Sequence, residues 1–153
     1  MRPTPVAAQL IERYLLSRGR RYFRGHHDGE YFFILTVGDE RLHVHLELAP
    51  TDPDRLTIRV APSYFFPAAD RARLVEFVDS WNQSPHRVAA VIHESSDPTR
   101  LGVSAENTSL IALDVSFDDF AGLVDQTIGS SIRLFGELPL ARNAPCMWVL
   151  DAG

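Results

Sequence analysis

Two pairs of histidines are the residues whose type and spacing could most readily do chemistry in this chain. His26 and His27 are adjacent, and a single residue separates His43 from His45. Alternate residues of a β-strand share one face, and imidazole is a common zinc ligand, so a metal site is one interpretation. The intervening residues are aromatic and aliphatic, however, and no cysteine or glutamate completes a closed ligand set. We therefore expect a structural or interface role for these histidines, with no metal and no cofactor.

The cysteine and the paired carboxylates are weaker candidates for catalysis. Cys146 is the only cysteine, and it lies in an apolar stretch without a recognisable base, so we expect a packed thiol. Asp118 and Asp119 begin a predicted helix, where acidic residues are favoured, and Asp52 and Asp54 suit a turn. The sequence also lacks a nucleophile elbow, a P-loop, a dinucleotide-binding glycine motif and a His-Glu-x-x-His motif. The sequence therefore predicts a protein that is not an enzyme.

Composition and charge exclude several further classes. The chain has 153 residues and a net charge of −5, and all 15 of its basic residues are arginines. Residues 1–24 carry +5 and the remainder −10, whereas a general nucleic-acid binder needs a basic face. Tyr31, Phe32 and Phe33 superficially suit base stacking, but the order of elements does not match an RNA-recognition module. We expect a cytoplasmic protein without nucleic-acid or membrane partners, because we find no signal peptide, no membrane span and only one cysteine.

Hydrophobic periodicity predicts three helices and six strands. The helices are expected at residues 5–19, 67–83 and 116–135, and the strands at 22–27, 31–37, 42–48, 56–60, 87–94 and 101–105. Pro5 and Pro67 suit first helical positions, Gly19 suits a helix end, and Ser116 suits a helix start. Residues 50–54 are expected to form a loop too rich in proline to pair, and residues 107–109 to interrupt the last strand.

Two-residue turns would fix the register of the second and third strands. Residue 37 then pairs with 40, 35 with 42 and 33 with 44. The predicted core face carries Tyr31, Phe33, Leu35, Leu42, Val44 and Leu46. The opposite face carries Phe23, Phe32, Ile34, His43, His45 and Glu47. Because this second face mixes apolar and polar residues, we expect it to be covered, either by the C-terminal tail with Trp148 or by another chain.

This order of elements predicts a single α+β domain. An antiparallel β-sheet is expected to carry N-terminal, middle and C-terminal helices in the order α-β-β-β-β-α-β-β-α. We place the domain at residues 1–136 and a C-terminal tail at residues 137–153.

Three segments carry a resemblance to a known family. They are Leu10 to Gly19 (LIERYLLSRG), Phe77 to Asn82 with its distinctive Trp81-Asn82 pair, and Leu113 to Phe117 before the last helix. With the order of elements, these segments resemble the YbjN-like family, within the superfamily of type III secretion chaperone-like folds. The resemblance spans residues 5–135, and the tail with Cys146 and Trp148 lies outside it.

The resemblance implies a non-enzymatic bacterial cytoplasmic protein with a chaperone-like fold. Such folds typically dimerise and offer apolar surface to protein partners. We expect a protein-binding module, chaperone-like or regulatory, that acts as a homodimer through Phe23, Phe32, Ile34, His43, His45 and Trp148. Trp81 and Asn82 are expected to be structural. The alternative is a small-ligand or metal-sensing domain that uses the histidine-bearing sheet face.

Overall fold

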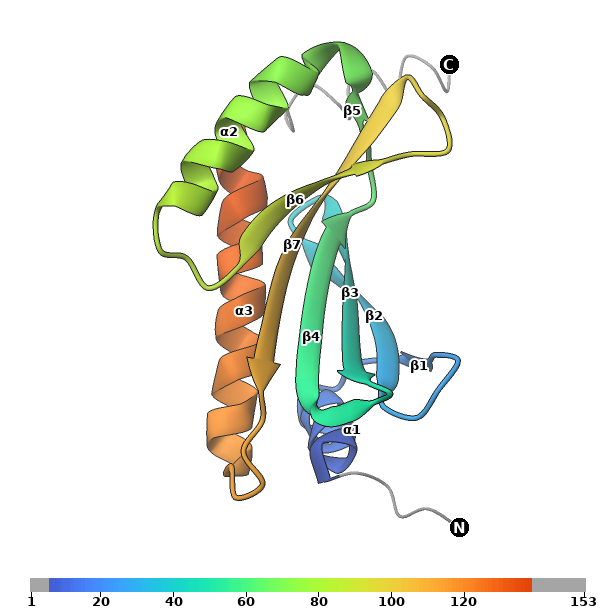
Figure 1. Cartoon of the computed structure of the whole chain (residues 1–153). Helices are drawn as coiled ribbons and strands as arrows, with labels where there is room; N and C mark the ends of the chain where they lie inside the picture. Colours follow the sequence, from blue (N-terminus) through green and yellow to red (C-terminus); the bar gives the residue numbers. More distant parts are fainter. Residues whose placement is uncertain (1–5, 139–153) are drawn as a thin grey trace.

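One antiparallel sheet with three helices forms the described part of the chain, residues 6–138 of a computed structural model (Figure 1). The helices are α1 (Val6–Ser17), α2 (Arg71–Gln83) and α3 (Phe117–Glu137), with a short 3-10 helix η1 (Ala68–Asp70) before α2. The strands are β1 (Phe23–Arg24), β2 (Glu30–Val37), β3 (Glu40–Ala49), β4 (Asp52–Pro62), β5 (Phe66–Pro67), β6 (Ala89–Glu94) and β7 (Arg100–Leu110). The predicted α+β class and order of elements are confirmed, with β5 as an added two-residue strand.

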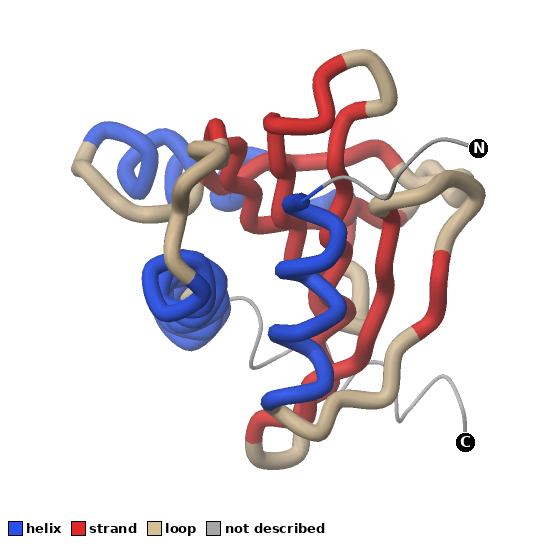
Figure 2. Tube along the Cα trace, turned by 90° about the horizontal axis from the view of Figure 1, so that it is seen from below, coloured by secondary structure: helices blue, strands red, loops and turns tan. Residues whose placement is uncertain are grey.

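Strands β1 to β4 form an antiparallel meander, and strands from the second half of the chain extend the sheet beyond β4. Its order is β1-β2-β3-β4-β7-β5, and β6 pairs with β7. The predicted register between β2 and β3 is confirmed, because Val37 pairs with Glu40 and Phe33 with Val44. All six residues of the predicted core face are buried. Figure 2 shows α1 lying across the strands, so one face of the sheet is covered by a helix.

Two helix ends follow the predicted local signals. Gly19 has a φ of 63°, and the Arg20 amide donates to the Leu15 carbonyl, which closes α1 in the left-handed conformation that glycine favours. At the start of α3, the Ser116 hydroxyl accepts a hydrogen bond from the Asp119 amide at 3.0 Å. Both ends therefore form where the sequence places them.

Four boundary predictions are wrong, because tertiary pairing overrides local composition. Strand β4 begins at Asp52, which pairs with Ala49, and Pro53 inside the strand does not prevent this pairing. Strand β7 continues through residues 107–109, which pair with residues 56–58 of β4. Helix α2 starts at Arg71, because Pro67 pairs with Arg100 in the sheet. The strand predicted at 22–27 is reduced to β1, and the predicted first turn around Pro5 lies outside the described residues.

Side-chain hydrogen bonds join helix α1 to helix α3 over one face of the sheet. The Tyr14 hydroxyl donates to Asp125 Oδ1 at 2.6 Å, and the Arg18 guanidinium donates to Asp125 Oδ2 at 2.6 Å. Partial burial of Asp125 acts to raise its pKa, but the bonds from Arg18 and Tyr14 outweigh it and leave the pKa lowered. The folded state therefore favours the ionised carboxylate.

This contact predicts a specific loss of stability in acid. Because the folded pKa of Asp125 lies below its unfolded value, its contribution is fully present above the unfolded value, about 4. That contribution is lost as the pH falls through the folded pKa. In urea unfolding from pH 7 to 2.5, Asp125→Asn is expected to reduce the loss of stability below about pH 4. Equal slopes for the variant and the wild type would contradict this prediction.

Among residues 6–138, no helix is long and apolar enough to cross a membrane. Helix α3 ends at Glu137, and Leu138 after it is fully buried; the domain boundary placed after residue 136 stays a prediction. Cys146 and Trp148 lie outside the described residues.

Candidate functional site

The sheet face opposite α1, which we call the outer face, carries an apolar patch near its β1 edge. Phe23 is 68% exposed, Phe32 39% and Ile34 49%. Phe23 and Phe32 are cross-strand partners, so the three side chains lie together on β1 and β2. We call these three residues the outer patch. Large apolar side chains gathered in this way mark an interaction surface more often than scattered ones do.

A groove of about 420 Å³ continues from the outer patch across β3 and β4. Its lining includes His43, His45, Arg59 and Ala61. The His45 ring stacks on Phe32 with ring centroids 4.4 Å apart and planes 9° from parallel. The structure therefore brings together five of the six residues predicted for partner binding, and the sixth, Trp148, lies outside the described residues.

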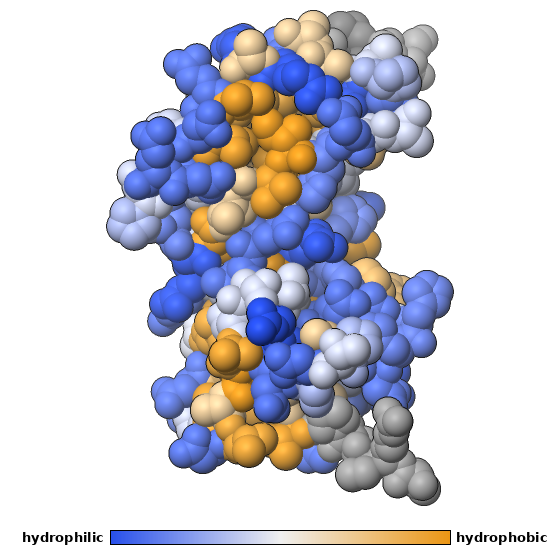
Figure 3. Space-filling model, in the orientation of Figure 1, coloured by the Kyte–Doolittle hydropathy of each residue, from blue (hydrophilic) through white to orange (hydrophobic). Residues whose placement is uncertain are grey.

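Other apolar side chains are exposed away from the outer patch. Figure 3 shows a mainly hydrophilic surface, with the largest gathering of hydrophobic residues on this side in the upper half, near α2. Phe65, which precedes β5, is 43% exposed, and Val75 of α2 is 41% exposed. Phe65 lies over Gly102, since a Cβ there would be 3.8 Å from its ring. This second location provides a matched reference for testing the outer patch.

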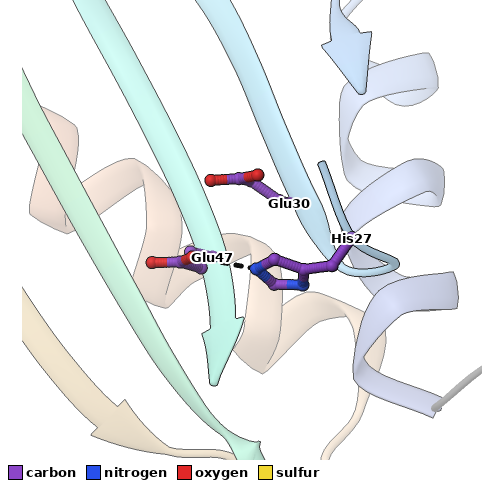
Figure 4. A group of neighbouring side chains, drawn as sticks. All are labelled: His27, Glu30 and Glu47. Carbon is purple, nitrogen blue, oxygen red and sulfur yellow. Dashed lines mark hydrogen bonds and ion pairs between the residues drawn. The ribbon is translucent and has the colours of Figure 1, made fainter. Parts of the chain in front are cut away.

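A histidine–glutamate cluster borders the outer patch at the start of β2. Figure 4 shows His27 from the loop after β1, with its ring directed at Glu47 of β3 and close to Glu30 of β2. His27 Nε2 lies 2.9 Å from Glu47 Oε2, and His45 Nε2 lies 2.9 Å from Glu30 Oε2. One potential ligand atom from each of His27, Glu30 and Glu47 lies within 4.8 Å of the others. The sequence alone shows no glutamate that completes a ligand set with the histidines, whereas the structure brings Glu30 and Glu47 together with His27.

The electrostatics of this cluster follow from two opposed carboxylates. Glu30 and Glu47 are direct cross-strand partners, an arrangement that destabilises a sheet unless positive charge balances it. Hydrogen bonds to Glu47 and to the Asp28 carbonyl raise the pKa of His27. Burial acts to raise the pKa of Glu30, but the His26 amide and His45 outweigh it, so the pKa is lowered. The shifts of His27 and Glu30 therefore both favour a positive charge beside a carboxylate.

The loop between β1 and β2 fixes the buried carboxylate. Glu30 Oε1 accepts from the His26 amide at 2.8 Å, and the Gly25 amide donates to the Glu30 carbonyl at 2.8 Å. A Cβ on Gly25 would lie 2.0 Å from Glu30 Oε1, so only glycine leaves room for this side chain. Gly29 has a φ of 90°, which a side chain rarely adopts. The local sequence thus holds Glu30 in place beside the outer patch.

The two members of each predicted histidine pair make different contacts. His27 and His45 contact glutamates of the cluster, whereas the His26 side chain is exposed and only its backbone amide binds Glu30. His43 lies in the groove, opposite Ile34 of β2 and Ala61 of β4. Sequence reasoning assigned neither glutamate to a site, although the alternation of β3 had placed Glu47 on the same face as the histidines.

The Trp81-Asn82 pair joins α2 to β6. The Trp81 indole N–H donates to the Val88 carbonyl at 3.0 Å, and its ring stacks on His86 with centroids 3.6 Å apart. The Asn82 side chain donates to the Ala90 carbonyl at 3.0 Å and accepts from the Ala90 amide at 2.9 Å. Its amide thus pairs with Ala90 as a neighbouring strand residue would. These contacts join the end of α2 to β6, and the structural role expected for the pair stays a prediction.

In the described residues, the fold and the site define an antiparallel α+β domain with a partly apolar outer sheet face. A comparison with solved structures finds this fold in YbjN from E. coli, whose crystal structure is described as that of "a putative transcription regulator". The TM-score is 0.64 at 13% sequence identity, over 88% of this chain and 92% of that one. The chain therefore has a YbjN-like fold. Comparisons with protein-family models and with curated proteins found no match.

Proposed function

We propose that this protein is a non-enzymatic protein-binding module that forms a homodimer through the outer patch. The observation that carries the proposal is the contiguous exposure of Phe23, Phe32 and Ile34 on the outer face of the sheet, within the described residues 6–138. The groove beside the patch is a depression into which side chains of a second molecule can pack.

The charges on the outer face favour a second copy of this chain as the occupant. One row of cross-strand partners runs from Phe23 through Phe32 and His45 to Arg59 and Glu106. Arg59 and Glu106 form an ion pair at 3.3 Å. A face with an apolar end and charges of both signs is complementary to itself under a two-fold rotation, which pairs the apolar ends and keeps like charges apart.

The expected strength of this interface is modest. Burying a large apolar side chain is worth about 1.5–3 kcal/mol, and the three side chains of the patch are already partly covered. Association costs at least about 4 kcal/mol in lost freedom of motion. The patch can therefore support a dimer only with contributions from the groove, and we expect dimerisation to depend on protein concentration. A regulatory adaptor, which must exchange partners, suits such an interface.

Replacing Phe32 by aspartate is expected to convert the dimer to a monomer. The new carboxylate would be buried without a partner at the centre of the interface, which strongly opposes association. Sedimentation equilibrium over a range of concentrations measures the mass of the wild type and of Phe32→Asp. Circular dichroism checks that the variant keeps its fold, which we expect because Phe32 is 39% exposed.

Phe65→Asp is the matched control, because Phe65 is similarly exposed at 43% but lies away from the outer patch. It is expected to leave the mass unchanged. A monomeric wild type, or a dimer broken by Phe65→Asp and not by Phe32→Asp, would overturn the proposal. A further outcome is a monomeric chain in which Trp148→Ala makes Phe32 accessible to quenchers or reagents in the solvent. The occupant of the outer patch would then be the tail and not a second copy of the chain.

A further inference from the structure

We propose that His27, Glu30 and Glu47 form a binding site for a divalent transition metal ion of the zinc type. The proposal does not depend on the homodimer. The three side chains come from the loop after β1, from β2 and from β3, and their ligand atoms lie within 4.8 Å of one another. Imidazole and carboxylate are both ordinary zinc ligands, and three protein ligands with one open position are typical of a reactive or exchangeable site.

The hydrogen bonds of His27 place a lone pair where a metal would accept it. Its Nδ1 lies 2.9 Å from the Asp28 carbonyl, which can only accept, so Nδ1 carries a proton. In the neutral ring, Nε2 is then unprotonated and lies 2.9 Å from Glu47 Oε2. Two acceptors at this distance repel unless a proton or a metal ion lies between them. A carbonyl that fixes the tautomer of a histidine is the usual outer partner of a metal ligand.

The distance between the His27 and Glu47 ligand atoms is close to the one that a shared ion imposes. Two atoms bound to zinc at about 2.1 Å lie about 3.0–3.4 Å apart when the angle between them is 90–109°. The observed 2.9 Å between His27 Nε2 and Glu47 Oε2 is near this range. The ligand atom of Glu30 lies within 4.8 Å of the other two, so all three atoms are near enough for one ion to draw them together.

The outer partners of Glu30 complete the arrangement. His45 Nε2 lies 2.9 Å from Oε2 of this carboxylate, and the His26 amide donates to Oε1 at 2.8 Å. Glu30 is 8% exposed, so its carboxylate is positioned by the fold and cannot simply turn into solvent. His27 and Glu47 have side-chain exposures of 29% and 32%, which leaves an ion accessible from solvent. A bound ion would tie the loop after β1 to two strands of the sheet.

The test measures metal binding by the full chain after removal of any affinity tag and treatment with a chelator. Isothermal titration with Zn²⁺ is expected to show one ion per chain. Titration with Co²⁺ is expected to give the visible absorption of a site with nitrogen and oxygen ligands. His27→Gln and Glu47→Gln are each expected to weaken Zn²⁺ binding at least about tenfold. Circular dichroism without metal verifies that each variant is folded.

His93→Gln is the matched control. His93 also faces a glutamate, with Nε2 3.2 Å from Glu106 Oε2, but Arg59 lies beside that carboxylate and supplies the positive charge. We expect this variant to bind Zn²⁺ as the wild type does. Should either cluster variant fail to fold, Zn²⁺ titration of the wild type followed by NMR must shift the His27 ring and not the His93 ring. Absence of saturable binding, equal loss in His93→Gln, or NMR shifts centred on His93 would each overturn the proposal.

Discussion

Trp81→Ala is expected to lower the free energy of unfolding by about 3–5 kcal/mol, the range for a buried tryptophan. Trp81 is 5% exposed, and it packs against Phe77 and His86 between α2 and β6. Truncation removes these contacts and leaves the Val88 carbonyl without its indole donor. Urea unfolding followed by circular dichroism measures the change. A loss below about 1 kcal/mol would mean that the pair does not hold α2 to the sheet.

Two further variants separate the packing of Trp81 from its hydrogen bond. Trp81→Phe keeps an aromatic ring but loses the indole donor, so we expect an intermediate loss of stability. Asn82→Ala removes both bonds to Ala90 while leaving the buried ring in place. Each neutral hydrogen bond contributes about 1 kcal/mol, so Asn82→Ala is expected to cost about 2 kcal/mol. A larger loss in Asn82→Ala than in Trp81→Ala would reverse this assignment.

Gly25→Ala is expected to destabilise the protein by about 1.5–3 kcal/mol, the contribution of hydrogen bonds to a charged group. The added methyl group would occupy the position of the Glu30 carboxylate, since a Cβ would lie 2.0 Å from Oε1. Glu30 must then move and lose its bonds to the His26 amide and to His45. Urea unfolding of the metal-free chain gives the free-energy change. NMR of the His45 ring reports whether its contact with Glu30 is lost.

The same substitution at Gly129 is the control and has the opposite expected sign. Gly129 lies in the exposed middle of α3, and a Cβ there meets nothing within 4 Å. Because alanine is favoured over glycine in a helix, Gly129→Ala is expected to stabilise by about 0.5–1 kcal/mol. If Gly25→Ala were also neutral or stabilising, the close approach of Glu30 to the loop would not be needed for folding.

The sequence by itself determined the parts of the fold that depend on near neighbours along the chain. The alternation of β2 and β3 and the turn at Gly38 were enough to place Phe33 opposite Val44. The cap at Ser116 and the glycine at residue 19 fixed two helix ends. These features need only a period, a turn type or a single side chain, so they can be recognised locally.

The ends of strands were decided by the tertiary structure. Residues 107–109 have a polar, turn-like composition, yet they pair with β4 because residues 56–58 present backbone groups that need partners. Backbone pairing with β7 likewise places Pro67 in β5 and not in the first turn of α2. The energy of a sheet depends on strands distant in sequence, and no local pattern records their position.

The outer patch was visible in the sequence, but the histidine–glutamate cluster was not. Phe32 and Ile34 followed from the alternation of one strand, whereas the cluster needed the loop at residue 27 to fold back over β3. That fold depends on Gly25, whose missing side chain leaves room for Glu30. The sequence determined which residues face outward. Only the tertiary structure decided which of them meet, because a loop brings its side chains within bonding distance of residues far along the chain.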